Sequence, residues 1–242
     1  MATFVLVHGA CHGAWCWSRL TPELEALGHR AVAIDLPGLG EDATPVADVT
    51  FEDTIARVVG AVETQSEPVV LVGHSLGGVS ISAAAERIPD RIKLLVYLAA
   101  FLPRDGDSVN AIYEAPDWPR EAPAPPPVRS ADGLSISHTP EGARQRFFHD
   151  CSDDDVDFAI ARLKPQPLVM RTTPVRVSPG RFGSVPRAYI HCLDDRAAPL
   201  ARQKKMVALS PCQKVAELPT GHSPFFSAPD LLASTLSDMA SR

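Results

Sequence analysis

The chain has 242 residues, of which 45 % are hydrophobic and 21 % charged, and its formal net charge is −6 at pH 7. This length and composition predict one globular domain with a full core, and they exclude two large domains. The acidic charge without any Lys/Arg run excludes a nucleic-acid-binding face, and no apolar stretch approaches the ~18 residues of a membrane span.

Five cysteines occur without close pairs or zinc spacing, which argues against a disulfide framework and against a metal site. The first residues, Met1 to His8, lack the basic region of a signal peptide and are typical of a first strand. We therefore expect a cytoplasmic protein in a reduced compartment. The oligomeric state is left open by the sequence, a homodimer included.

Apolar runs alternate with helical patterns over the first hundred residues. Strands are expected at 4–7, 31–34, 68–72 and 92–98, and helices at 20–27, 51–62 and 79–88. This alternation predicts βαβ units, and the continuous apolar runs indicate a parallel sheet buried on both faces. The fold class is therefore α/β, with a mostly parallel sheet of about six strands flanked by helices.

The pattern breaks where prolines become dense, and this density forbids long helices and central strands. Aromatic residues there provide apolar surface for packing, and a helix is expected at 153–163. Residues 103–186 are therefore interpreted as an inserted cap, the alternative being a disordered linker. Residues 1–102 and 187–242 form the core, whose later strands and helices are expected at 188–192, 200–209, 214–218 and 231–239.

The strongest local signal is Gly73-His74-Ser75-Leu76-Gly77, between a predicted strand and a predicted helix. This G-x-S-x-G pattern in a strand–turn–helix setting is typical of the nucleophile of an α/β-hydrolase. The tight turn raises the Ser75 hydroxyl above the carboxyl edge of the sheet, at a helix N-terminus that favours developing negative charge. Leu76 N–H is one expected oxyanion donor, and Ala10 N–H, in the loop after the first strand, is the other.

A serine nucleophile requires a histidine, and the histidine requires a carboxylate to orient it. In this fold the chain order is Ser, Asp, His, and His222, just past the last strand, meets that order. Asp194 and Asp195 both follow the penultimate strand, and the residues alone do not decide between them. No metal, nucleotide or other cofactor is needed for this chemistry.

The chain resembles the plant methylesterase and hydroxynitrile lyase group of α/β-hydrolases and its bacterial pyrethroid-type carboxylesterase relatives. The stretches that carry the resemblance are 4–15, 24–29, 70–78, 98–103 and 182–190. The family acid lies in an Asp-x-x-x-Pro pattern, and Asp195-Arg-Ala-Ala-Pro199 matches it whereas Asp194 does not. The family base usually follows an Asp, but Gly221 precedes His222 here. The resemblance therefore implies a Ser75–His222–Asp195 triad.

The resemblance also separates esterases from lyases. The lyases of the group carry a lysine after the catalytic histidine, a threonine at the position of Gly9 and a cysteine at the position of Leu76. This chain has Ser223 after His222 and therefore resembles the esterase branch. The alternatives are a hydroxynitrile lyase, a non-catalytic small-molecule receptor on the same fold, and a hydrolase that tailors a natural product.

The expected partner is a small, uncharged, hydrophobic or aromatic ester, possible methyl esters included. The cap sets the size of the substrate, and an apolar pocket suits such an ester. Aromatic residues expected near its mouth are Trp118, Phe147, Phe148, Phe225 and Phe226.

Overall fold

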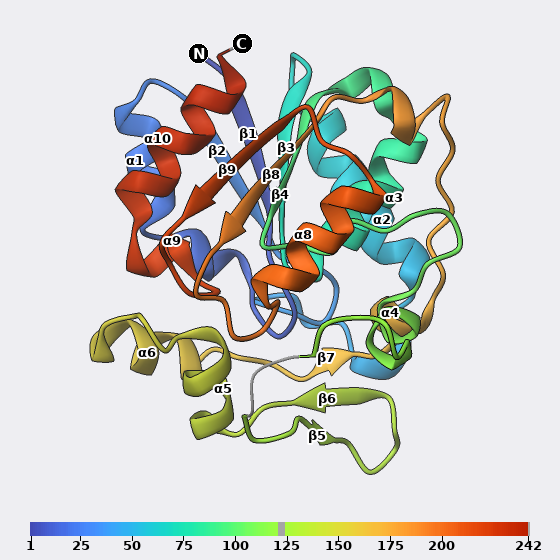
Figure 1. Cartoon of the computed structure of the whole chain (residues 1–242), viewed down its shortest axis with the longest axis vertical. Helices are drawn as coiled ribbons and strands as arrows, with labels where there is room; N and C mark the ends of the chain where they lie inside the picture. The colour runs from blue at the N-terminus through green and yellow to red at the C-terminus, as the bar shows by residue number, and fades with distance from the viewer. Residues whose placement is uncertain (121–123, 242) are drawn as a thin grey trace.

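The computed structural model describes residues 1–120 and 124–241 and has a six-stranded parallel sheet at its centre (Figure 1). The strands follow the spatial order β2-β1-β3-β4-β8-β9. Their bounds are β1 Thr3–Val7, β2 Arg30–Ile34, β3 Val69–His74, β4 Ile92–Leu98, β8 Arg187–Cys192 and β9 Lys214–Leu218. The predicted α/β class and the parallel sheet of six strands are confirmed.

Helices cover both faces of the sheet, which explains why its strands are apolar on both sides. In β1, Phe4 and Leu6 face one core, and Val5 and Val7 face the other, as the two-residue period of a strand requires. The first core is covered by α1 Leu20–Ala26 and α10 Pro229–Ala240, with the short α9 Pro224–Ser227 beside them. The second is covered by α2 Phe51–Glu63, α3 Gly77–Arg87 and α8 Leu200–Leu209.

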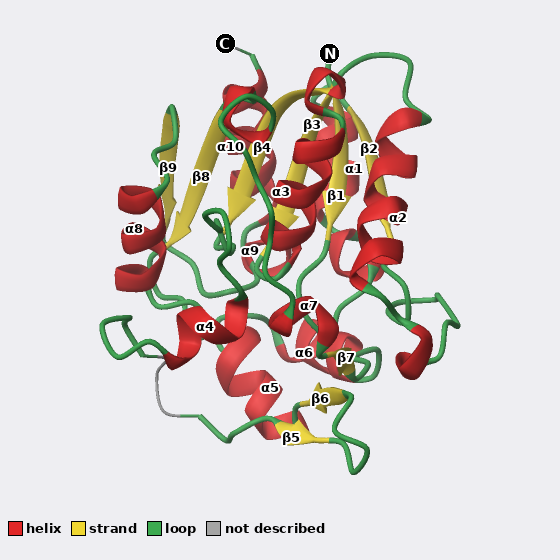
Figure 2. Cartoon of the chain, turned by 90° about the vertical axis from the view of Figure 1, so that its right-hand side faces the viewer, coloured by secondary structure: helices red, strands yellow, loops and turns green. Residues whose placement is uncertain are grey.

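The segment between β4 and β8 lies across the carboxyl ends of the strands, as Figure 2 shows. It contains an antiparallel sheet of β5 Val128–Arg129, β6 Ser135–Ser137 and β7 Gln166–Pro167. Its helices are α4 Val109–Glu114, α5 Pro140–Phe147, α6 Asp153–Ile160 and α7 Val169–Thr172. These elements cover the sheet edge at which Ser75 lies.

Local side chains set where three of the short helices of this segment begin. Ser108, Thr139 and Ser152 each accept a hydrogen bond from a first-turn N–H and so begin α4, α5 and α6. The helix predicted at 153–163 ends at Ile160, and Pro165 disfavours helical geometry at the residue before it. Four 3-10 turns complete the described elements, at Ala14–Trp17, Val46–Asp48, Pro89–Arg91 and Phe182–Ser184. Across the described residues, no helix is both long and apolar enough to cross a membrane.

Candidate active site

Ser75 lies in the turn between β3 and α3 with a left-handed backbone, at φ 50°. A non-glycine residue at positive φ is strained, and strain of this kind concentrates at functional sites. The surrounding hydrogen bonds hold it there, since Ser75 N–H donates to the Leu98 carbonyl and the Ser75 carbonyl accepts from Gly78 and Phe101. A Cβ on Gly73 would come 2.9 Å from the Gly77 backbone, so this turn closes only with glycine there.

His222 and Asp195 form a buried pair in the loops after β9 and β8. His222 Nδ1 lies 2.7 Å from Asp195 Oδ2, and their side chains are 1 % and 0 % exposed. The other carboxylate oxygen, Oδ1, accepts hydrogen bonds from the N–H groups of Ala197 and Ala198 at 2.7 and 2.8 Å. Because an ionised carboxylate only accepts, the proton of the imidazole lies on Nδ1 and Nε2 is left as the basic nitrogen.

The loop that carries His222 is tied to the serine turn. His74, the residue before Ser75, donates from Nε2 to the His222 carbonyl at 2.9 Å, and the two rings are 4.5 Å apart between centroids. On its other side, Gly221 N–H donates to Asp150 Oδ2 at 2.6 Å. These bonds hold the base loop beside the nucleophile turn at the carboxyl edge of the sheet.

The two predicted oxyanion donors, Ala10 N–H and Leu76 N–H, have no acceptor among the described residues. Both residues line one cavity with Ser75. A Cβ on Gly9 would come 2.9 Å from Ser75 Cβ and 2.8 Å from His74 Nδ1, which shows how closely this loop approaches the serine. Two unpaired N–H groups beside a serine are suited to hold a carbonyl oxygen that gains negative charge.

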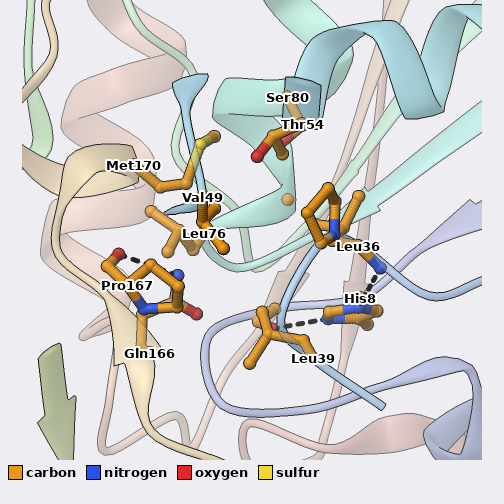
Figure 3. Close-up of a pocket in the computed structure, with 13 residues that line it drawn as sticks. His8, Leu36, Leu39, Val49, Thr54, Leu76, Ser80, Gln166, Pro167 and Met170 are labelled. Carbon is orange, nitrogen blue, oxygen red and sulfur yellow. Dashed lines mark hydrogen bonds between the residues drawn. The ribbon is translucent and has the colours of Figure 1, made fainter. Parts of the chain in front are cut away.

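His8 orients the peptide that carries the Ala10 N–H group. Leu36 N–H donates to His8 Nε2 at 3.2 Å, so that nitrogen is unprotonated, and His8 Nδ1–H therefore donates to the Gly9 carbonyl at 2.8 Å (Figure 3). The carbonyl of Gly9 and the N–H of Ala10 belong to one trans peptide and point in opposite directions. Holding the carbonyl therefore fixes the direction of the N–H.

The hollow beside His8 in Figure 3 is a separate feature, bounded by Leu76, Met170 and Ser80 among others. Its volume is about 10 Å³. A space of ~10–15 Å³ holds one water at most, so this hollow cannot take a substrate.

The cavity beside Ser75 has a volume of about 200 Å³. It lies between the core and the segment that joins β4 to β8, which we call the cap. Phe147, one of the aromatic residues predicted at the pocket, lines it together with Phe101 and Ile136. The other predicted aromatic residues do not line this cavity. Phe148, Phe225 and Phe226 are buried in the core under α1 and α10, and Trp118 packs beneath Lys205 of α8.

Three polar residues of the cavity wall escaped the sequence analysis: His138, Arg146 and Arg171. They come from the loop after β6, from α5 and from α7, so no single motif or period joins them. Among the described residues, no group of three or more His, Cys, Asp or Glu side chains could hold a metal ion.

Buried neutral histidines make the stability of the fold sensitive to acid. Burial lowers the pKa of His8 to about 4 and that of His12 to about 3, from 6.5. Below pH 6.5 the unfolded chain binds protons at these rings while the folded chain does not, so the free energy of unfolding falls as the pH falls. We expect these two groups to lower it by up to ~3 kcal/mol per pH unit between pH 6 and 4.5. Urea denaturation at constant ionic strength measures this slope, and equal stability at pH 7 and pH 5 would contradict the neutral assignment.

The chain is similar to known proteins over most of its length. Residues 4–235 match the family model described as "Alpha/beta hydrolase family". Methylesterase 1 of Arabidopsis thaliana is 33 % identical over 244 residues, covering 95 % of this chain and 92 % of that protein. Salicylic acid-binding protein 2 of Nicotiana tabacum is 36 % identical over 211 residues, covering 81 % and 80 %.

Solved structures of relatives superpose on nearly the full length of this chain. The crystal structure of polyneuridine aldehyde esterase superposes with a TM-score of 0.86 at 29 % identity and covers 100 % of both chains. A pyrethroid hydrolase from Sphingobium faniae JZ-2 superposes with a TM-score of 0.86 at 30 % identity, covering 99 % of this chain and 97 % of that one. The predicted resemblance to methylesterases and pyrethroid-type carboxylesterases is confirmed.

Proposed function

The chain belongs to the alpha/beta hydrolase family and is a carboxylic ester hydrolase, and from this premise we propose that it cleaves small esters through a Ser75–His222–Asp195 triad. The observation that carries the proposal is the buried His222–Asp195 pair, 2.7 Å apart, whose loop is tied to the strained turn of Ser75. A carboxylate-oriented imidazole beside an elbow serine is the arrangement that activates a hydroxyl for attack.

In the proposed reaction, His222 Nε2 takes the proton of Ser75 Oγ as that oxygen attacks the ester carbonyl. The N–H groups of Ala10 and Leu76 hold the resulting oxyanion, and the imidazolium is stabilised by Asp195. His222 then gives the proton to the alcohol oxygen, and the alcohol leaves the acyl-enzyme. Water repeats the sequence: its proton passes to His222, its oxygen attacks the acyl carbon, and Ser75 Oγ takes the proton back.

The substrate has a compact hydrophobic or aromatic part. Phe101, Ile136 and Phe147 supply apolar surface in the cavity, and its volume of about 200 Å³ is small beside the ~300–1,000 Å³ of typical ligand pockets. Two relatives carry the name methylesterase, and this name supports methanol as the alcohol part of the ester. We therefore expect methyl esters to be turned over faster than esters of bulky alcohols.

A lyase reaction on the same scaffold is disfavoured by the structure around Gly9. The lyases of this group carry a threonine at that position, but a Cβ there would come 2.8 Å from His74 Nδ1 and 2.9 Å from Ser75 Cβ. The residue after His222 is Ser223 and not the lysine that assists departing cyanide.

Labelling with a fluorophosphonate tests the proposal together with two assays. We expect one phosphonyl group per chain, on Ser75, because only an activated serine reacts with this probe. We also expect hydrolysis of p-nitrophenyl acetate and no release of cyanide from aromatic cyanohydrins. Peptide mass spectrometry locates the label. An unlabelled protein without esterase activity would point to a receptor, and cyanide release without ester hydrolysis would point to a lyase.

A further inference from the structure

The cavity beside Ser75 has a cationic wall in a chain of net charge −6. Arg146, Arg171 and His138 line it, and none of its described lining residues is Asp or Glu. Burial and the neighbouring Arg171 and Arg202 lower the pKa of Arg146. Burial, reinforced by Arg171, lowers the pKa of His138 to about 4, so His138 is neutral at pH 7. Arg171 therefore contributes a guanidinium, which is always protonated in proteins, to this wall.

Arg171 has neutral partners in the described part of the chain. Its Nε donates to Asn110 Oδ1 at 3.2 Å, and its guanidinium carbon lies 4.9 Å from the centre of the Tyr113 ring. Neither contact neutralises its charge, and its two terminal nitrogens make no hydrogen bond within residues 1–120 and 124–241. The terminal nitrogens of a guanidinium form a planar fork that matches the two oxygens of a carboxylate.

A positive charge held at a cavity wall without an anion is costly, and a bound anion offsets that cost. The chain could have filled this position with an apolar residue, as it does at Phe101 and Ile136 of the same wall. Asn110 and Tyr113 of α4 instead hold the Arg171 side chain in place, which lowers the entropy lost when a ligand binds it.

We propose that the ester hydrolysed by this protein carries a carboxylate, which the terminal nitrogens of Arg171 bind while Ser75 attacks the ester carbonyl. This inference rests on the proposed esterase function and replaces the expectation of an uncharged substrate. The same cavity of about 200 Å³ takes both groups, so the substrate class is the half-ester of a compact dicarboxylic acid.

Matched pairs of esters test the inference. The monomethyl and dimethyl esters of succinic acid form one pair and those of terephthalic acid another, and the readout is the ratio of kcat/KM for half-ester over diester. We expect a ratio above one for wild type in at least one pair, and a fall of about ten- to hundredfold in Arg171→Gln, because a charge-assisted bidentate contact is lost. Arg171→Lys, which keeps the charge without the fork, should give an intermediate ratio.

Arg176→Gln is the matched control, since it removes the same charge from an exposed arginine that pairs with Asp105 outside the cavity. It should keep the wild-type ratio. If Arg171→Gln does not fold, raising the salt concentration with wild type still tests the inference, because screening should lower the ratio.

The outcomes separate the two proposals. A wild-type ratio that never exceeds one, or a ratio that Arg171→Gln leaves unchanged, overturns the carboxylate inference. Hydrolysis of the diesters in the same experiment would still support the proposed esterase function. If neither member of any pair is hydrolysed and Ser75 is not labelled by a fluorophosphonate, the proposed function fails and the inference fails with it.

Discussion

Replacing Ser75 with alanine is expected to lower kcat for ester hydrolysis by roughly 10⁴- to 10⁶-fold, because the oxygen that forms the acyl-enzyme is removed. The remaining N–H donors and the cavity still bind the ester, so KM should change much less than kcat. Steady-state hydrolysis of p-nitrophenyl acetate, corrected for the uncatalysed rate, measures the loss. The variant should also lose fluorophosphonate labelling completely.

Two observations make this test specific. Alanine at position 75 keeps the positive φ of the turn and its backbone hydrogen bonds, so we expect a Tm within about 2 °C of wild type. Ser80→Ala is the matched control, since Ser80 lies one turn further along α3 and its hydroxyl has no hydrogen-bond partner among the described residues. A Ser75→Ala protein that retained a tenth of wild-type turnover would exclude Ser75 as the nucleophile.

Replacing Asp195 with asparagine is expected to lower kcat by about 10⁴-fold at neutral pH. The asparagine amide can donate to His222 Nδ1, which moves the ring proton to Nε2 and removes the basic nitrogen that faces the reaction. The Asp195 side chain is fully buried and its Oδ1 accepts from two backbone N–H groups, so we expect a shifted loop to account for part of the loss. Thermal denaturation beside the kinetics separates this destabilisation from the change in tautomer.

Asp194→Asn is the matched control for the acid. Asp194 is exposed, and its backbone N–H, not its side chain, makes the hydrogen bond to the Thr220 carbonyl. We expect less than a threefold change in kcat. The reverse ranking, with a severe loss at 194 and a mild one at 195, would assign the acid to the other member of the doublet.

The core of the fold follows closely from the sequence because its strands are continuous apolar runs. The strand expected at 214–218 and the helix expected at 200–209 have those bounds in the structure. The helix expected from Val79 begins two residues earlier, at Gly77. Glycine has low helix propensity, but a Cβ at Gly78 would come 2.0 Å from the Phe101 carbonyl oxygen. The close packing of α3 against the Phe101 backbone requires glycine at this position, and helix propensity alone does not predict that a helix begins there.

The serine turn and the base loop were predictable because each follows a strand, and all parallel strands end at one edge. The cavity wall was not predictable, since Arg146 and Arg171 meet only through the folding of the cap. Phe147 and Phe148 show the same limit. They are adjacent in sequence and both belong to the same buried core, but only Phe147 also lines the cavity.

The hydrogen bond from Gly221 to Asp150 has a consequence for engineering. Asp150 lies between α5 and α6 of the cap, and its Oδ1 would be 2.5 Å from a Cβ at position 221. A carboxylate contributed by the cap therefore occupies the space that an aspartate at position 221, the residue that the family resemblance leads us to expect there, would enter. Replacing the cap with one that lacks this carboxylate would leave the Gly221 N–H without its acceptor and would weaken the tie between the loop of His222 and the cap.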